Sequence, residues 1–311
     1  MTDRGLVALS SGSVLTVGTF DGVHLGHREI LRDLNERAER CGLPAVVVTF
    51  TPHPLAVVNP AAAPKLLTPD VERIALIAGE ASTAHAVVIP FSTAVAALSA
   101  EQFVRLLVDC YAMRELVVGY DHGLGRGRHG DVGVLRALGS KLGFVVQVVA
   151  AKTGPHGIAI SSTAIRRAVA YGELEGARAM LGRRYSMHGV VVPGSSRGRG
   201  IGIPTINLAI PVEKLLPPDG VYAVRVFAPK GTYGGMMNLG GRPTFGESER
   251  TPEIHLFDAS GDWYGDAVLV EFVLRIRDIV RFASVDQLKD QLGRDAANAR
   301  QALTPIASVP S

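Results

Sequence analysis

The chain has 311 residues, enough for two domains of ordinary size or one large domain. Apolar residues make up 47% of it and charged residues 20%, which provides for a hydrophobic core and excludes a disordered chain. The 32 Lys and Arg residues against 29 Asp and Glu residues leave a net charge of +3, which disfavours DNA or RNA as a partner.

Cysteine use and hydropathy indicate a protein of a reducing compartment. The two cysteines, Cys41 and Cys110, lie far apart, which excludes a disulfide scaffold and a structural zinc site. The first fifteen residues lack the apolar stretch of a signal peptide. The charge-free run Ala81–Ala100 has the length of a membrane span, but Pro90 and several polar residues interrupt it. We therefore expect a cytoplasmic protein without a membrane segment.

The first half of the chain alternates between short Val-rich runs and helical patterns. Runs that are apolar on both faces are typical of buried parallel strands. Strands are predicted over Val14–Gly18, Ala45–Phe50, Ala86–Phe91, Glu115–Gly119 and Phe144–Val149, and helices over His24–Arg40, Pro69–Glu80, Ala100–Ala112 and Val132–Leu142. This alternation predicts a doubly wound, Rossmann-like α/β domain, whose ligands bind at the carboxyl ends of the strands.

The pattern changes after Gly182. Long alternating runs separated by Gly and Pro clusters are typical of an antiparallel barrel or sandwich. Strands are predicted over Tyr185–Pro193, Gly220–Phe227, Thr232–Leu239, Pro252–Asp258 and Ala267–Ile276. A capping box at Ser284 and Gln287 predicts a last helix that runs toward Leu303. The composition shift places the boundary between two domains, residues 1–182 and 183–311.

The segment after the first predicted strand has the features of a phosphate-binding site. It reads Thr19-Phe-Asp-Gly-Val-His-Leu-Gly-His27, so a strand is followed by a turn and by two histidines that open a helix. The positive helix end attracts an anion, His24 and His27 add donors, and Gly22 and Gly26 let the backbone approach it closely. This stretch resembles the HxGH nucleotidyltransferase superfamily. Such enzymes bring a phosphate nucleophile to the α-phosphate of a nucleoside triphosphate and release pyrophosphate.

A second motif, Ile160-Ser-Ser-Thr-Ala-Ile-Arg166, resembles the segment that holds the triphosphate in these enzymes. Ser162 is predicted to cap a helix that carries Thr163 and Arg166 one turn apart. The resemblance implies that adenylyl transfer depends on His24, His27 and Arg166. It also implies nucleotide contacts by Gly18, Phe20, Asp21, Gly26, Ser162 and Thr163.

Two further segments resemble bacterial FMN adenylyltransferases. Thr49-Phe-Thr-Pro-His-Pro54 follows the second strand and is similar to their TFxPHP loop. After the strand Glu115–Gly119 the family has a D/N-F-x-F-G pattern, in which His122 and Leu124 replace the two aromatics here. Aromatic stacking on the flavin is therefore not expected at these two positions. The resemblance implies flavin contacts by Pro52, Pro54 and Asp121.

The same region holds a formal GxGxxG match over Gly125–Gly130. It begins well after the end of the strand, and Val145–Thr153, about 20 residues on, holds no Asp or Glu that could bind a ribose. A dinucleotide-dependent dehydrogenase is therefore disfavoured. A mobile loop that covers a ligand is the preferred interpretation.

The second half opens with a loop rich in Gly and Arg, Gly194–Asn207, whose composition alone indicates a flexible solvated loop. Its last four residues, Pro204-Thr-Ile-Asn207, resemble the PTAN motif of riboflavin kinases. The resemblance implies two Mg²⁺ ligands and two phosphate-binding arginines: Thr205, Asn207, Arg197 and Arg199. Ile206 replaces the usual Ala, and in a strand it points away from its two neighbours, so the ligating face is kept.

Two downstream segments also resemble riboflavin kinases: Asn238-Leu-Gly-Gly-Arg-Pro-Thr-Phe245 and Glu253-Ile-His-Leu-Phe-Asp258. The resemblance implies that Glu253 is the base that takes the proton from the ribityl 5′-hydroxyl of riboflavin. His255 lies on the same strand face and is interpreted as a structural histidine. No G-K-[ST] triplet occurs in the sequence, which excludes a P-loop kinase.

These motifs cover the chain from about Val14 to about Leu303 and together resemble the bifunctional prokaryotic riboflavin kinase/FMN adenylyltransferase family. The resemblance implies an α/β nucleotidyltransferase domain followed by an antiparallel six-stranded β-barrel with a terminal helix. It implies ATP, riboflavin and FMN as substrates, FAD as product and Mg²⁺ as cofactor, with neither nucleic acid nor membrane as partner. The pattern predicts no oligomeric state. Two alternatives stay open: a superfamily enzyme with another acceptor, and a flavin-binding carrier that has lost catalysis.

Overall fold

The computed structural model describes residues 12–80, 84–154, 157, 159–194, 203–241 and 250–304. Its contacts divide the chain into two compact units, Met1–Ser162 and Thr163–Ser311. Helices α7 (Ser162–Ala170) and α8 (Leu174–Leu181) thereby fall almost entirely in the second unit. The domain boundary expected after residue 182 stays a prediction.

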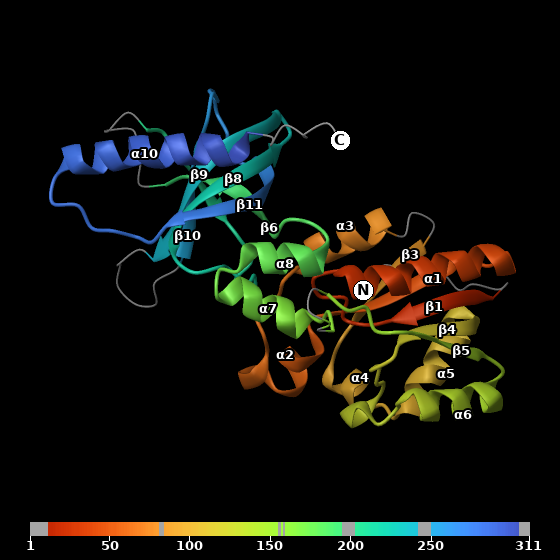
Figure 1. Ribbon diagram of the computed structural model, residues 1–311. Helices are drawn as coiled ribbons and strands as arrows, with labels where there is room; N and C mark the ends of the chain where they lie inside the picture. Colours follow the sequence, from red (N-terminus) through yellow and green to blue (C-terminus); the bar gives the residue numbers. More distant parts are fainter. Residues whose placement is uncertain are drawn as a thin grey trace. The chain divides into compact units, whose positions relative to one another are not determined.

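The first unit is built on a five-stranded parallel sheet (Figure 1). Its order, β3-β2-β1-β4-β5, places the first strand at the centre. The strands are β1 (Ser13–Val17), β2 (Ala45–Thr51), β3 (Ala84–Pro90), β4 (Met113–Gly119) and β5 (Val145–Val149). This arrangement confirms the predicted Rossmann-like domain.

Helices cover both faces of this sheet, as Figure 1 shows. On one face Val14 of β1 packs in a cluster with Leu31 of α1 (Leu25–Cys41) and Ile77 of α3 (Asp70–Glu80). On the other face the next residue, Leu15, packs in a cluster with α5 (Ala100–Tyr111) and α6 (Val132–Leu142). Successive side chains of a strand point to opposite faces, so a strand that is covered on both faces is mostly apolar.

Short helices complete the connections. They are α2 (Pro54–Val58), η1 (Pro60–Ala62), α4 (Thr93–Ala97) and η2 (Arg126–Arg128). The predicted capping box of α5 is present, with both hydrogen bonds between Ser99 and Gln102 formed. None of the helices in the described part of the chain combines the length and the apolar composition needed to cross a membrane.

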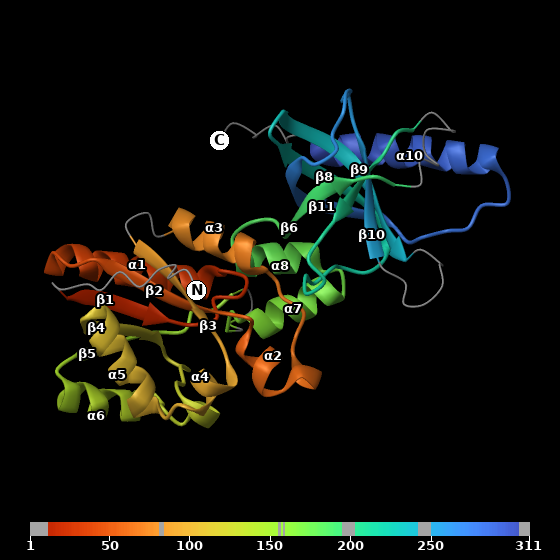
Figure 2. The same ribbon diagram turned by 180° about the vertical axis from the view of Figure 1, so that it is seen from behind.

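The second unit contains a closed antiparallel barrel (Figure 2). The strand order around it is β10-β7-β6-β11-β8-β9. The strands are β6 (Ser186–Val192), β7 (Ile206–Ala209), β8 (Gly220–Ala228), β9 (Gly231–Gly241), β10 (Arg250–Leu256) and β11 (Ala267–Arg277). The six-stranded barrel predicted from the resemblance is therefore confirmed.

The last helix, α10 (Val285–Leu303), packs on the outside of the barrel against β8, β9 and β11. Ser284 caps it as predicted, but Gln287 accepts its side-chain hydrogen bond from the backbone of Ala283. The carboxylate of Asp295 is fully buried and accepts bonds of 3.0 and 2.7 Å from Arg277 on β11. This partly buried ion pair holds the helix against the barrel.

Candidate active sites

Three neighbouring strands bring predicted site residues to the carboxyl edge of the sheet. Gly18 follows the central strand β1, and its N–H donates a 3.0 Å hydrogen bond to the carbonyl of Val48 on β2. Pro52 follows β2 across a cis peptide bond with Thr51, and Asp121 follows β4. The order β2-β1-β4 makes these segments neighbours, at the edge where α/β domains bind their ligands.

The two histidines of the HxGH motif are packed against each other at the start of α1. His24 is the N-cap residue, is 5% exposed, and accepts a 3.3 Å hydrogen bond at Nδ1 from the backbone N–H of His27. The two rings are stacked with centroids 3.6 Å apart, and Phe20 meets His27 edge-on at 5.1 Å. A Cβ at Gly26 would lie 3.2 Å from the His24 ring, so glycine leaves room for this packing.

The loop between β1 and α1 holds an unusual backbone conformation. Phe20 has a φ of 49° and Val23 a φ of 36°, and Gly22 between them has a φ of 89°. Positive φ is rare for residues other than glycine, most of all for a β-branched residue such as valine. Each such residue costs on the order of 1–3 kcal/mol and persists only where its surroundings enforce it.

Asp21 supplies that enforcement from inside the loop. Its carboxylate is fully buried and accepts hydrogen bonds from the backbone N–H groups of Leu67 at 3.1 Å and Thr68 at 2.9 Å. The Thr68 hydroxyl in turn accepts a 2.7 Å bond from the N–H of Gly22. The Asp21 carboxylate thus anchors the loop to the segment before α3, and the contact of Asp21 with the nucleotide stays a prediction.

The segment with the second phosphate motif joins this loop through Ser162. The hydroxyl of Ser162 donates a 2.7 Å hydrogen bond to the backbone carbonyl of Asp21. Ser162 is itself the first residue of α7, where a residue preceding the helix was predicted. Thr163 is exposed and Arg166 half-buried on α7, in the second unit, and their roles in nucleotide binding stay predictions.

The predicted flavin loop after β2 is a short structured turn. His53 caps α2 by accepting a 3.2 Å hydrogen bond at Nδ1 from the N–H of Leu55, and Pro54 occupies the first turn of that helix. Pro52 and Asp121 are both exposed, as a ligand contact requires.

A buried arginine that the sequence analysis missed holds the start of this turn. Arg73 of α3 is fully buried and donates hydrogen bonds to the carbonyl of Phe50 at 2.8 Å and to Asp70 at 2.6 Å. The other carboxylate oxygen of Asp70 accepts a hydrogen bond from the hydroxyl of Thr51. Asp70 and Arg73 are only three positions apart, but no local sequence signal shows their bonds to Thr51 and Phe50, which lie 19 and 23 positions away.

In the barrel the strand register aligns three polar residues of the kinase motifs. Glu253 on β10 is paired with Asn207 on β7 and with Asn238 on β9. Directly opposed residues of antiparallel strands point to the same face, so the three side chains form one row. Ile206 is paired with the fully buried Ile254, so it lies on the opposite face, as predicted.

The segment Pro204–Asn207, which was predicted to bind Mg²⁺, is packed closely against the end of β6. A Cβ at Gly194 would lie 1.9 Å from Nδ2 of Asn207, so only glycine fits there while the amide keeps its place. Asn207 is 6% exposed, whereas Thr205 precedes β7 and is exposed. Arg197 and Arg199, the predicted phosphate-binding arginines, lie outside the described residues.

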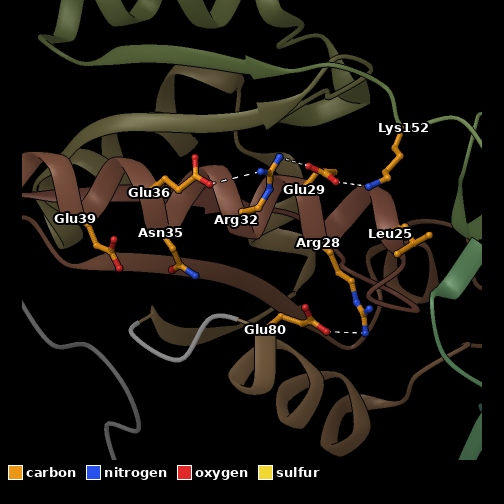
Figure 3. Close-up of a pocket in the computed structure, with 9 residues that line it drawn as sticks. All are labelled: Leu25, Arg28, Glu29, Arg32, Asn35, Glu36, Glu39, Glu80 and Lys152. Carbon is orange, nitrogen blue, oxygen red and sulfur yellow. Dashed lines mark hydrogen bonds and ion pairs between the residues drawn. The ribbon is translucent and has the colours of Figure 1, made fainter.

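A charged groove of about 410 Å³ lies along α1 (Figure 3). It is lined by Leu25, Arg28, Glu29, Arg32, Asn35, Glu36, Glu39, Glu80 and Lys152. Arg28 pairs with Glu80 at 2.6 Å, and Glu29 lies between Lys152 and Arg32. Hydrogen bonds from Lys152 first, and then from Arg32, lower the pKa of the Glu29 carboxyl. None of the predicted site residues that the structure describes lines this groove, whose ion pairs connect α1 to its neighbours.

Comparison with known proteins accounts for both halves of the chain. Residues 7–164 match the family model described as FAD synthetase, and residues 181–303 match the model described as riboflavin kinase. Over 306 residues the chain is 38% identical to the bifunctional riboflavin kinase/FMN adenylyltransferase of Escherichia coli strain K12, covering 96% of both chains. The chain belongs to the bifunctional riboflavin kinase/FMN adenylyltransferase family. The Bacillus subtilis strain 168 protein of the same name is 34% identical and covers 92% of this chain and 91% of its own.

A solved structure shows the same architecture. The crystal structure of a protein named as a macrolide-efflux protein of Streptococcus pneumoniae matches with a TM-score of 0.84 and 33% identity. The match covers 94% of this chain and 95% of that one, so it includes both the sheet and the barrel. Membership of the riboflavin kinase/FMN adenylyltransferase family confirms the resemblance drawn from the HxGH and PTIN motifs. The match of the second half also argues against a nucleotidyltransferase with another acceptor.

Proposed function

We propose that this chain performs two successive phosphate-transfer reactions at two sites. The barrel converts riboflavin and ATP to FMN and ADP, and the α/β domain converts FMN and ATP to FAD and pyrophosphate. The observation that carries the proposal is the match of each half to a different family model, riboflavin kinase and FAD synthetase. We assign adenylyl transfer to residues 1–182 and the kinase reaction to residues 183–311.

In the kinase reaction, Glu253 is the base. Its carboxylate takes the proton from the 5′-hydroxyl of riboflavin while that oxygen forms a bond to the γ-phosphorus of ATP. The bond between the γ-phosphorus and the bridging oxygen breaks, and ADP leaves. Asn207 lies beside Glu253 on the same strand face, so the base and the phosphate-binding motif meet at one place.

The residues around Asn207 suit Mg²⁺. The Thr205 hydroxyl and the Asn207 amide oxygen are hard donors of the kind that this cation takes. Within the described ranges no group of three or more His, Cys, Asp or Glu side chains is placed to hold a metal. An ion held by two neutral oxygens depends on substrate phosphates for its other ligands, which is typical of Mg²⁺ at kinase sites. When bound, it neutralises charge on the transferring phosphoryl group.

In adenylyl transfer, an oxygen of the FMN phosphate forms a bond to the α-phosphorus of ATP. The bond between the α-phosphorus and the oxygen of the β-phosphate breaks, and pyrophosphate leaves. Because the attacking FMN phosphate is already ionised, it has no proton to lose in this step. The Nδ1 atom of His24 accepts a hydrogen bond, so in the neutral ring the proton is on Nε2, which can donate to a phosphate. His27 and the N-terminus of α1 add positive potential at the same place.

The substrates and products are small molecules: riboflavin, FMN, FAD and ATP. Cys41 and Cys110 are not disulfide-bonded, which is consistent with a reducing compartment. We therefore place both reactions in the cytoplasm. The net charge of +3 gives no support to a nucleic-acid partner.

Two substitutions test whether the sites are separate. Glu253→Ala should lower FMN formation from riboflavin by about 10²–10⁴-fold, because the general base is lost. It should leave FAD formation from supplied FMN near the wild-type rate. His27→Ala should lower FAD formation from supplied FMN and leave FMN formation near the wild-type rate, because a hydrogen-bond donor to phosphate is lost from the adenylyl-transfer site. Separation of the flavins after incubation with ATP and Mg²⁺ measures both reactions. A single change that abolished both activities in a folded protein would contradict the two-site proposal.

A further inference from the structure

The ring of His255 contacts the beginning of the PTIN segment (Pro204–Asn207). His255 lies on β10, and its Nδ1 atom is 2.8 Å from the carbonyl oxygen of Pro204. A carbonyl oxygen only accepts hydrogen bonds, so Nδ1 carries the proton and donates. Phe257 meets the His255 ring edge-on, with centroids 5.7 Å apart and an interplanar angle of 76°. The ring is therefore held from its side while its donor faces Pro204.

This hydrogen bond lies just beyond the end of the hydrogen-bonded ladder between β7 and β10. The last paired residues of β7 and β10 are Ile206 and Ile254. Continuing the register places His255 opposite Thr205, which precedes β7 and is exposed. The Pro204 carbonyl and the Thr205 N–H belong to one planar peptide group, so a bond to that carbonyl constrains the backbone of Thr205.

We propose that His255 is a positioning residue of the kinase site, which orients Thr205 toward a divalent cation and the nucleotide phosphates that it carries. The inference rests on the proposed kinase function of the barrel. His255 acts on the ligand through Thr205 and does not touch the ligand itself. Loss of one such hydrogen bond lowers the fraction of molecules with Thr205 in place, which weakens binding by about 3- to 10-fold.

Two substitutions distinguish the effect of the His255 hydrogen-bond donor from the effect of the packing of its ring. His255→Phe keeps an aromatic ring beside Phe257 but removes the donor. His255→Asn places an amide N–H where Nδ1 lies and serves as the matched control. Both variants are made in the full chain. Formation of FMN is measured at varied Mg–ATP, and the shift is expected in KM, with kcat changed less.

Binding is measured independently by unfolding in the presence of Mg–ADP. The single tryptophan, Trp263, lies in the second unit, so its fluorescence reports unfolding of that unit. A ligand that binds only the folded state raises the unfolding midpoint according to its concentration relative to Kd. His255→Phe should need about 3- to 10-fold more Mg–ADP than wild type for the same rise, and His255→Asn should restore most of the response.

The outcomes distinguish the inference from the function on which it rests. If wild type forms FMN and His255→Phe lowers only the ligand-free midpoint, with an unchanged Mg–ADP response, His255 is merely structural and the inference is wrong. The inference is also wrong if His255→Asn behaves like His255→Phe. If wild type forms no FMN and shows no Mg–ADP response, the proposed kinase function itself fails.

Discussion

Replacing Asp21 by asparagine removes a charge and one acceptor oxygen from the buried interior of the HxGH loop. The carboxylate accepts backbone hydrogen bonds at both oxygens, from Leu67 and from Thr68. The amide introduced by Asp21→Asn would keep one acceptor oxygen, and its NH₂ group would face the backbone N–H of either Leu67 or Thr68, where no hydrogen bond can form. Losing a charge-assisted bond costs about 1.5–3 kcal/mol, and a buried unsatisfied donor about 1–3 kcal/mol. We expect a total loss of about 2.5–6 kcal/mol.

The loss should fall on the first unit and on its reaction. We expect Asp21→Asn to release the constraint that holds Phe20 and Val23 at positive φ, and so to displace the neighbouring His24 and His27. A displacement of about 1 Å can cost about 10²-fold in rate. Conversion of supplied FMN to FAD should therefore fall by about that factor, while FMN formation from riboflavin is retained. Chemical denaturation followed by far-UV circular dichroism measures the lost stability.

A matched variant makes this test specific. Asp109 lies exposed on α5, so Asp109→Asn makes the same chemical change outside the loop and should alter neither stability nor adenylyl transfer. If Asp21→Asn unfolds at the wild-type denaturant concentration and forms FAD at the wild-type rate, the anchoring role of Asp21 is refuted. Equal effects of the two variants would likewise refute it.

Two further changes probe other contacts. Gly194→Ala should force the amide of Asn207 to move by roughly 1.5 Å to restore ordinary contact, and kinase activity should fall by about 10²-fold with adenylyl transfer of supplied FMN unaffected. The pKa of Glu29 lies below its ordinary value of 4.5. The ion pairs of Glu29 therefore stabilise the fold fully above about pH 4.5, and this stabilisation is lost as the pH falls through the lowered pKa. Lys152→Met should raise the Glu29 pKa in an NMR titration; an unmoved titration would contradict the attribution to Lys152.

The repeating elements of both domains could be predicted because their patterns are long. The helix predicted over Val132–Leu142 has the bounds of α6, and the predicted strand Ala267–Ile276 is one residue shorter than β11. The five-residue helices α2 and α4 were not predicted, because one turn and a half carries no measurable periodicity. The strand β7 has only four residues, and its place in the barrel comes from pairing with distant strands.

The candidate sites were predictable as motifs, but not as contacts. The HxGH motif indicates a phosphate site at a helix start, and His24 does cap α1. The partners of Asp21 lie 46 and 47 positions away, so no local pattern shows that its carboxylate is committed inside the protein. The bond from His255 to Pro204 spans 51 positions and is equally invisible to spacing arguments. Such partnerships depend on which strands and loops the tertiary fold brings together.

Closure of the barrel determines how the kinase half can be re-engineered. Every strand of the closed sheet is hydrogen-bonded on both sides, so β10 lies between β7 and β9. A one-residue shift of β10 would turn Glu253 to the opposite face and break both ladders at once. The separation of Glu253 from Asn207 is therefore fixed by the scaffold. Variants meant to accept flavin analogues with longer or shorter polyol arms should be sought in the connecting loops, with the strands left unchanged.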